Sequence, residues 1–331
     1  MHITLTARHR ARARGCLLGQ LTGDALGTTV EFSKAAAIAR RYPDGLRDVV
    51  GGGPFNVLPG QVTDDSELAL SLARALAAHG ADFDAIARSY VEWCWSDPFD
   101  IGGTTLNAFH FARGTAIDER TVATNAADYN GHPSRQANGS LMRVSPLGIF
   151  GAFADPTVLA DLARRDSRLS HPSAPCQEAC VAFTRAIALA IADAAPPRAA
   201  YDAALASVDT PSGRDSGVHG WVLEAADAAP ICDAGGTGWV KTALQNAFHR
   251  LLHAASFEDG LVATVMAGGD ADTNAAIAGA LLGAVHGELD IPPAWRETVL
   301  GCVTPRGPRY QSRDARELAI ALLERGAREL G

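Results

Sequence analysis

The sequence predicts an all-α protein, a compact single-domain helical bundle that spans residues 1–331. Ala is abundant, whereas β-branched residues that alternate with polar ones, the pattern of a strand, are scarce. Most segments instead repeat apolar residues with the 3.6-residue period of a helix. No stretch is long or polar enough to link two domains, so one domain is expected although this length would allow two.

The composition is that of an ordinary globular chain, with 47% hydrophobic and 20% charged residues. A net charge of −8 argues against nucleic acid as the main partner. No signal-peptide core is recognisable near the N-terminus, and the longest apolar run, 275–285, is too short to span a bilayer. We therefore expect a cytoplasmic monomer with no nucleic-acid or membrane partner.

The six cysteines are scattered and include no CxxC pair, which argues against both a zinc site and a disulfide framework. They are Cys16, Cys94, Cys176, Cys180, Cys232 and Cys302. Cys176 and Cys180 are one helical turn apart, and we interpret them as small core residues.

The first predicted helix, 7–27, carries glycine at every fourth position, namely Gly15, Gly19, Gly23 and Gly27. A stripe of glycines lets another backbone approach closely, despite a helix-propensity cost of about 1 kcal/mol for each Gly. The predicted helix 271–287 has the same spacing at its end. We expect these two helices to pack in the centre, with Asp24 on a buried turn where it needs a partner.

An acidic cluster, Thr63-Asp64-Asp65, begins the next predicted helix, in which Leu68 and Leu72 continue the apolar period. Asp64 and Glu67 form a capping-box pattern, which requires one oxygen-bearing residue rather than three in a row. Adjacent carboxylates repel unless a positive charge lies between them, and a hard divalent cation would supply it. The alternative is a well-capped surface helix, the commoner setting for these residue types.

A second cluster, Asp270, Asp272 and Thr273, begins the predicted helix 271–287. The two clusters together offer four carboxylates and two hydroxyls, enough oxygens for one or two octahedral ions with water. We therefore predict that they meet in space although some two hundred positions separate them.

Glu31 lies between apolar neighbours, which predicts either a partly buried carboxylate with a raised pKa or a glutamate in a solvated loop. Residues 42–60 are rich in Gly and Pro and predict a loop, and residues 96–105 end one helix and begin another with Asp100 near its start. Further helices are predicted at 82–95, 138–150, 156–168, 174–193, 237–254, 257–267, 292–302 and 314–329, and loops at 121–137, 194–198 and 209–220.

Two other features are open to two interpretations. The turn Asn138-Gly139-Ser140 can offer backbone N–H groups to an anion or can merely cap a helix. His171, next to Pro172, can contact a ligand or can be structural. The HExxH, GxSxG, P-loop and GxGxxG motifs are absent, which disfavours zincins, serine hydrolases, NTPases and dinucleotide-binding folds.

Five motifs, in this order, resemble those of the ADP-ribosylglycohydrolase family, in the group of the dinitrogenase-reductase-activating glycohydrolase. They are Gly23–Phe32, Thr63–Ser66, Asp100–Gly102, Asn138–Arg143 and Gly269–Thr273. The resemblance extends from about residue 12 to residue 290, and five motifs in order are far more specific than any one of them.

The resemblance implies an all-helical fold whose central cleft holds two Mg²⁺ ions, with Mn²⁺ equally compatible. The metal ligands that it implies are Thr63, Asp64, Asp65, Asp270, Asp272 and Thr273. It implies catalytic roles for Glu31, which resembles the family's mobile glutamate, and for Asp100, which matches an acid near the scissile bond in arginine-specific members. Asn138, Gly139 and Ser140 resemble the turn that receives the diphosphate, and His171 matches a histidine near the ADP-ribose cleft.

The chain departs from its relatives at two positions that bear on the substrate. Gln136 stands where some members carry a Tyr that stacks on adenine, which leaves the adenine contact open. Some arginine-specific vertebrate members lack an acid equivalent to Glu31, so its presence favours the bacterial or serine-acting branches.

The activity that the resemblance implies is hydrolysis of the glycosidic bond at C1″ of ADP-ribose, in ADP-ribosylated arginine or serine side chains or in small ADP-ribosyl conjugates. One alternative is a catalytically silent relative that binds ADP-ribose, although Glu31 and the complete acid set argue against it. Another is a two-metal phosphoester or diphosphate hydrolase, which also uses clustered acids.

Overall fold

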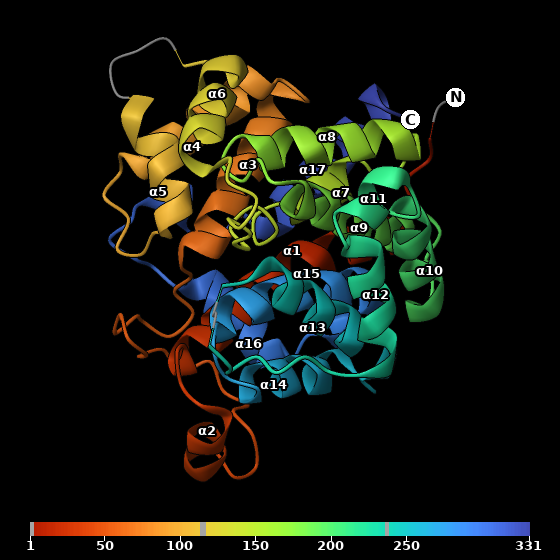
Figure 1. The fold of residues 1–331 in the computed structure, drawn as a ribbon. Helices are drawn as coiled ribbons and strands as arrows, with labels where there is room; N and C mark the ends of the chain where they lie inside the picture. Colours follow the sequence, from red (N-terminus) through yellow and green to blue (C-terminus); the bar gives the residue numbers. More distant parts are fainter. Residues whose placement is uncertain (1–2, 113–116, 236–237) are drawn as a thin grey trace.

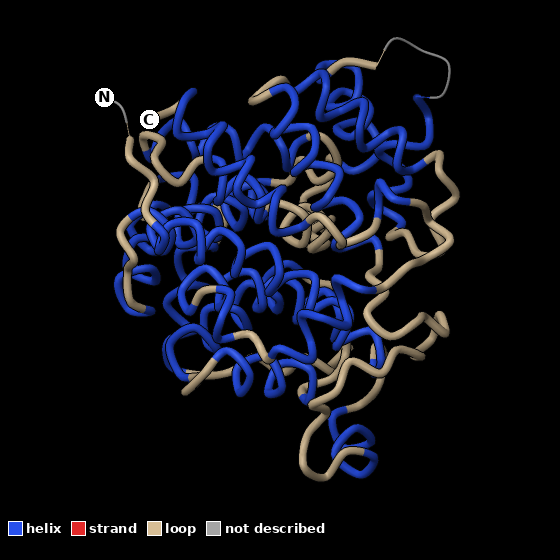
Figure 2. The backbone as a smooth tube through the Cα atoms, turned by 180° about the vertical axis from the view of Figure 1, so that it is seen from behind, coloured by secondary structure: helices blue, strands red, loops and turns tan. Residues whose placement is uncertain are grey.

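The computed structural model describes residues 3–112, 117–235 and 238–331, and in these residues every regular element is a helix (Figure 1). Figure 2 shows the same helices from behind, joined by loops. The described residues form no β-sheet and contain only isolated backbone bridges, such as those of Lys34 with Gly268 and of Ala137 with Trp239. The all-α prediction is therefore confirmed.

The α-helices follow one another along the described chain with mostly short connections. They are α1 (Ala7–Gly27), α2 (Ala35–Arg41), α3 (Asp64–His79), α4 (Phe83–Cys94), α5 (Gly103–Phe109), α6 (Glu119–Asn130), α7 (Ser145–Phe150), α8 (Pro156–Arg168), α9 (Ala174–Ala192), α10 (Pro197–Ser207), α11 (Pro211–Asp215), α12 (Val218–Asp227), α13 (Val240–His253), α14 (Phe257–Met266), α15 (Ala271–His286), α16 (Pro293–Gly301) and α17 (Ala315–Glu329). Short 3-10 turns are η1 (Thr28–Val30), η2 (His110–Ala112), η3 (Glu288–Asp290) and η4 (Pro308–Tyr310).

Helices α1 and α15 lie in the middle of the molecule and run antiparallel in close contact (Figure 1). A Cβ atom at Gly19 would lie 2.1 Å from the carbonyl oxygen of Gly279, and one at Gly15 would lie 2.3 Å from that of Gly283. No side chain fits between the two backbones, so the packing predicted from the glycine spacing is confirmed. The pairing also places the C-terminal end of α1 against the first turn of α15.

Two segments predicted as loops contain helices. Residues 121–137 include most of α6, whose Val122 and Ala126 are buried while polar residues cover its outer side and Asp118 caps its first turn. Residues 209–220 contain α11 and the start of α12, and the Thr210 hydroxyl caps α11 by accepting from Gly213 N. Polar composition indicated loops, but a helix needs only a narrow apolar face and a cap.

The remaining helix boundaries differ from the prediction by small amounts, with three exceptions. The predicted start of a helix at residue 237 lies outside the described residues, and α13 begins at Val240. The turn at 138–143 precedes α7 rather than forming part of it. Helices α2 and α10 were not predicted, and α2 with the loop that follows projects from the body (Figures 1 and 2).

Helix α9 is long and apolar enough to cross a membrane by length and composition alone. However, 72% of the tested stretch is buried inside the molecule, where α9 packs against α7, α8 and α10. Cys176 and Cys180 are on its buried side, and all six cysteines are free. Its apolar surface therefore faces neighbouring helices.

Candidate functional site

A cavity of about 220 Å³ opens where the first turns of α3 and α15 meet. The predicted site residues that line it come from six different segments of the chain: Glu31, Asp64, Asp65, Asp100, Asn138, Gly139, His171, Asp270, Asp272 and Thr273. Thr63 and Ser140 are fully buried behind the wall. The two acidic clusters therefore lie in one cavity, as the sequence predicts.

Asp24, at the end of α1, holds the first turn of α3 in place. Its carboxylate is fully buried and accepts hydrogen bonds from the backbone N–H groups of Thr63 and Ser66, each at 3.1 Å, and from the Thr63 hydroxyl at 3.1 Å. Burial raises the pKa of Asp24 to about 7 although these hydrogen bonds lower it. The sequence indicated that Asp24 needs a partner, and that partner is the turn bearing Asp64 and Asp65.

Asp64 and Asp65 project into the cavity from this turn. One oxygen of Asp65 accepts from the Thr63 hydroxyl at 2.9 Å, whereas its Oδ1 is buried with no hydrogen-bond partner among the described residues. Asp64 Oδ2 accepts from Gly102 N at 3.4 Å, which links it to the Asp100 loop. Burial raises the pKa of both carboxyls well above the usual range, and repulsion from Asp100 on Asp64 and from Asp64 on Asp65 raises it further.

The second acidic cluster is positioned by two glycines before α15. Gly268 and Gly269 have φ of 70° and 71°, in the left-handed region that glycine adopts without strain. Gly269 donates to Ser33 O at 2.9 Å and accepts from Phe32 N at 2.7 Å, which places the Glu31 segment beside the start of α15. Asp270 Oδ2 accepts from the Asn138 amide at 2.7 Å.

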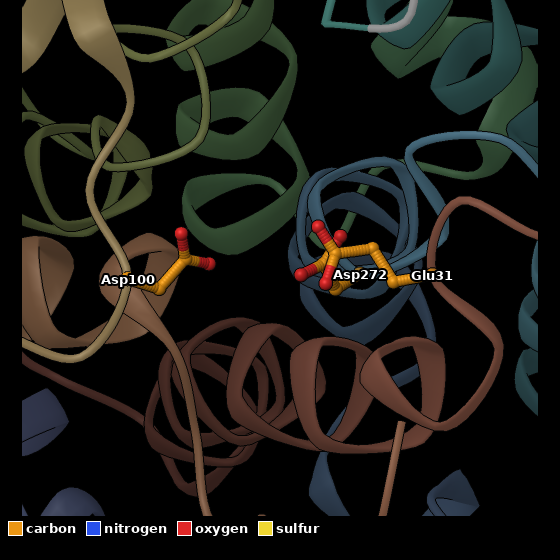
Figure 3. Close-up of side chains that lie close together, drawn as sticks. All are labelled: Glu31, Asp100 and Asp272. Atoms are coloured by element: carbon orange, nitrogen blue, oxygen red, sulfur yellow. The ribbon is translucent and has the colours of Figure 1, made fainter. Parts of the chain in front are cut away.

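Glu31, Asp100 and Asp272 lie close together in the cavity. Each offers a carboxylate oxygen, and these three oxygens lie within 4.8 Å of one another (Figure 3). Burial, then repulsion from Asp100 and Asp270, raises the pKa of Glu31 to about 8, and burial followed by repulsion from Asp270 raises that of Asp100 to about 6. Glu31 is only 7% exposed, so the buried interpretation is confirmed and the solvated loop is excluded.

The acids that line the cavity, and Asp24 behind it, have no positive partner in the described parts of the chain. None of Asp24, Glu31, Asp64, Asp65, Asp100, Asp270 and Asp272 takes part in an ion pair there. Glu31 Oε2 and Asp65 Oδ1 are buried without any hydrogen-bond donor in those residues. Buried unpaired carboxylates are costly, and an oxygen-rich set of this kind fits hard divalent cations.

The turn at 138–140 and His171 form another part of the cavity wall. Gly139 packs so closely on the imidazole that a Cβ there would lie 2.7 Å from His171 Cε1. The Ser140 hydroxyl accepts from Ser167 Oγ at 3.0 Å and faces the core rather than the cavity. Asn138 and His171 therefore present side chains to the cavity, and Ser140 does not.

Trp239 is a nearby aromatic residue that sequence reasoning missed. Its indole N–H donates to the Gln136 side chain at 3.0 Å, and the residue is 42% exposed. Gln136 O accepts from Val240 N, and Gly238 O accepts from Asn138 N, each at 2.9 Å, which ties this segment to the 138–140 turn. The sequence signal for this residue is a Gly-Trp pair just before a helix. Without knowledge of the tertiary contact to Gln136, that pair does not indicate a binding residue.

Fold and site together define a class: an all-helical protein in which buried carboxylates converge at the ends of two central helices. The family profile described as ADP-ribosylglycohydrolase matches residues 5–329, and the chain belongs to this family of ADP-ribosyl hydrolases.

Relatives and a solved structure agree with this assignment over nearly the whole chain. The Rhodospirillum rubrum ADP-ribosyl-[dinitrogen reductase] glycohydrolase is 34% identical over 290 residues, which cover 86% of this chain and 88% of that protein. The ADP-ribosylarginine hydrolase Tri1 of Pseudomonas putida (strain GB-1) is 29% identical, covering 87% of this chain and 74% of that protein. A solved structure described as an ADP-ribosylglycohydrolase-related protein complex matches with a TM-score of 0.77 and 27% identity. The match covers 97% of this chain and 100% of the chain in that structure.

Proposed function

We propose that this chain hydrolyses the glycosidic bond at C1″ of ADP-ribose, in ADP-ribosylated arginine or serine side chains or in small ADP-ribosyl conjugates. The observation that carries the proposal is the cavity in which Glu31, Asp100 and Asp272 converge beside Asp64 and Asp65. It is supported by relatives named for hydrolysis of ADP-ribosylarginine and of ADP-ribosylated dinitrogen reductase.

The residues of the cavity fit two Mg²⁺ ions, or Mn²⁺, since both bind carboxylate and hydroxyl oxygens. The residues that would hold them are Asp64, Asp65, Asp270, Asp272 and Thr273, which line the cavity, and Thr63, whose buried hydroxyl donates to Asp65 behind the wall. When bound, such ions acidify water and orient the hydroxyls of a sugar. The Asp65 oxygen without a hydrogen-bond partner, and the absence of any ion pair to these acids among the described residues, support this assignment.

Glu31 and Asp100 supply the proton chemistry of the proposed reaction. Glu31 orients the attacking water and takes its proton, for which a carboxylate with raised proton affinity is suited. Asp100, which offers a carboxylate oxygen within 4.8 Å of one on Glu31, gives a proton to the leaving side chain as its bond to C1″ breaks. The backbone N–H groups of Gly139 and Ser140 bind the diphosphate, whereas the Asn138 N–H is engaged with Gly238 O and the Asn138 side chain orients Asp270.

Trp239 supplies the aromatic surface for the adenine ring in place of the tyrosine that Gln136 replaces. Its indole edge is held by Gln136, and Trp221 packs against it at a centroid distance of 5.9 Å. These contacts leave the ring both oriented and partly exposed, as a stacking platform requires.

Product analysis tests the proposal directly. Arginine- and serine-linked ADP-ribosyl peptides are incubated with the protein, with and without a chelator, and the products are separated. We expect free ADP-ribose and unmodified peptide, with turnover lost in chelator and restored by Mg²⁺ or Mn²⁺. AMP with a phosphoribosylated peptide would instead identify a diphosphate hydrolase, and binding of ADP-ribose without turnover would identify a silent relative.

A further inference from the structure

A buried polar network leads from the core to the cavity wall and ends on His171. Arg143 is fully buried and pairs with Asp166 of α8, with Nε 3.2 Å from Oδ2. The Tyr90 hydroxyl donates to the other oxygen of Asp166 at 2.6 Å. Arg143 Nη1 donates to Ser170 Oγ at 2.6 Å, and Ser170 Oγ lies 2.8 Å from His171 Nδ1. The proposed reaction assigns no role to this network.

The donors and acceptors of the network determine which imidazole nitrogen carries the proton. A guanidinium only donates hydrogen bonds, so Ser170 Oγ accepts from Arg143. The hydroxyl has one proton of its own, and His171 Nδ1 is the acceptor that the described residues provide for it. Nδ1 therefore accepts, and the proton of the neutral ring is on Nε2.

The Nε2 atom of His171 is buried and has no hydrogen-bond partner among the described residues, although His171 lines the cavity. Gly139 covers this edge of the ring, since a Cβ there would lie 2.9 Å from Nε2. A buried N–H without an acceptor costs free energy, so an unpaired donor in a cavity wall indicates that a ligand supplies the acceptor.

We propose that Arg143 and Ser170 are positioning residues that hold His171 as a neutral imidazole whose Nε2–H donates to an oxygen of the bound substrate. The tautomer follows from the network alone, whereas the identity of the substrate, as an ADP-ribosyl group, rests on the proposed function. In this role His171 recognises substrate and neither takes nor gives a proton. Proton transfer is left to Glu31 and Asp100.

Charges around the ring support a permanently neutral imidazole. Burial, and then the adjacent Arg143 charge, lower the pKa of His171 to about 3. The groups that face the network from neighbouring helices are Tyr90 of α4, Asp166 of α8 and Cys180 of α9. Asp166 is engaged with Arg143, which leaves His171 without a carboxylate of its own.

Nitrogen NMR of ¹⁵N-histidine-labelled full-length protein tests the tautomer. The signals of His171 are assigned by their loss in a His171→Gln variant. We expect a pyrrole-like Nε2 and a pyridine-like Nδ1, both unchanged between about pH 5 and pH 9, where an ordinary histidine titrates. A pyridine-like Nε2, or titration within this range, would overturn the proposal. This measurement needs no activity and is independent of the proposed function.

A titration with ADP-ribose tests the contact with substrate. Binding is followed by calorimetry and the ring signals by NMR in the same sample. We expect the Nε2 signal to shift with saturation while Nδ1 remains pyridine-like. Bound ADP-ribose with an unmoved Nε2 signal overturns the substrate contact, whereas absence of ADP-ribose binding counts against the proposed function and leaves the tautomer result standing.

Ser170→Ala tests the positioning role, with Ser173→Ala as the matched control. Both remove a buried hydroxyl from the same segment, but only Ser170 contacts the imidazole. We expect Ser170→Ala to mix the two tautomers and to raise KM about tenfold, the loss of one directed hydrogen bond, with a smaller effect on kcat. Ser173→Ala should change neither. An unchanged tautomer in folded Ser170→Ala would refute the role of Ser170.

Discussion

Glu31 shows how a single residue acquires its chemistry from its surroundings. Its neighbours in the chain are apolar, and the backbone contact between Phe32 and Gly269 brings it beside the first turn of α15. There its carboxylate meets Asp100 and Asp272, which are far away in the sequence. Burial, and then repulsion from Asp100 and Asp270, raise the pKa of Glu31 to about 8, so it binds a proton more tightly than a solvated glutamate does.

Replacing Glu31 by Gln is expected to lower kcat by about 10²-fold or more, because it removes a general base while retaining the shape of the side chain. The Kd for ADP-ribose should change little, since Glu31 acts on water. Glu297→Gln, an exposed residue of α16, is the control and should leave both constants unchanged. Near-normal turnover in Glu31→Gln would show that another group activates the water.

At the scale of the helices, the site depends on how closely α1 approaches α15. Asp24 at the end of α1 fastens the first turn of α3, and α15 begins beside it. A Cβ at Gly27 would lie 2.5 Å from Asp272 Cα, so even the last glycine of the stripe is needed for the acids to converge. The same packing that forms the core therefore also forms the cavity.

Gly279→Ala is expected to destabilise the protein by about 1–3 kcal/mol or more, because its Cβ would lie 2.1 Å from Gly19 O and the two helices must move apart. Gly220→Ala, in α12, meets nothing within 4 Å and is the matched control, with a change of at most about 1 kcal/mol in either direction. Chemical denaturation of both variants measures the difference. Equal stability of Gly279→Ala and the original protein would contradict the close packing.

Local sequence signals predicted the elements that have strong ones. The glycine spacing of α1 and α15 predicted their contact, and Thr63, Asp64 and Asp65 predicted a helix start. Helix α6 was missed because its apolar face is narrow, with Val122 and Ala126 buried. The role of Trp239 could not be predicted, since its position depends on a hydrogen bond to Gln136, one hundred and three positions away.

Over the whole molecule, the buried carboxylates of the acidic cavity lower the stability of the fold, and a bound cation or bound protons reduce this loss. Burial raises the pKa of Asp24 to about 7, of Glu31 to about 8 and of Asp100 to about 6. The folded protein without cations therefore retains protons that the unfolded chain releases above about pH 4. Because the unfolded state then binds fewer protons, stability falls as pH rises from about 4 to about 8.

In chelator, the melting temperature is expected to fall as pH increases over this range, and saturating Mg²⁺ should raise it by an amount that grows with pH. The physical reason is that a bound cation replaces the retained protons, and ligand at about 100 times its Kd adds about 2.7 kcal/mol of stability. Thermal melts at matched ionic strength, with Mg²⁺ or with chelator, measure the difference at each pH.

Asp65→Asn distinguishes this effect from a general effect of salt or pH. The amide retains an oxygen that can accept from Thr63 but removes one buried charge, so the chelated variant should melt higher than the original protein above about pH 7 and gain little from Mg²⁺. Asp48→Asn removes an exposed charge and should behave like the original protein. If Mg²⁺ stabilises Asp65→Asn as much as the original protein, Asp65 is not a ligand, and the cavity must bind the cation through its other acids.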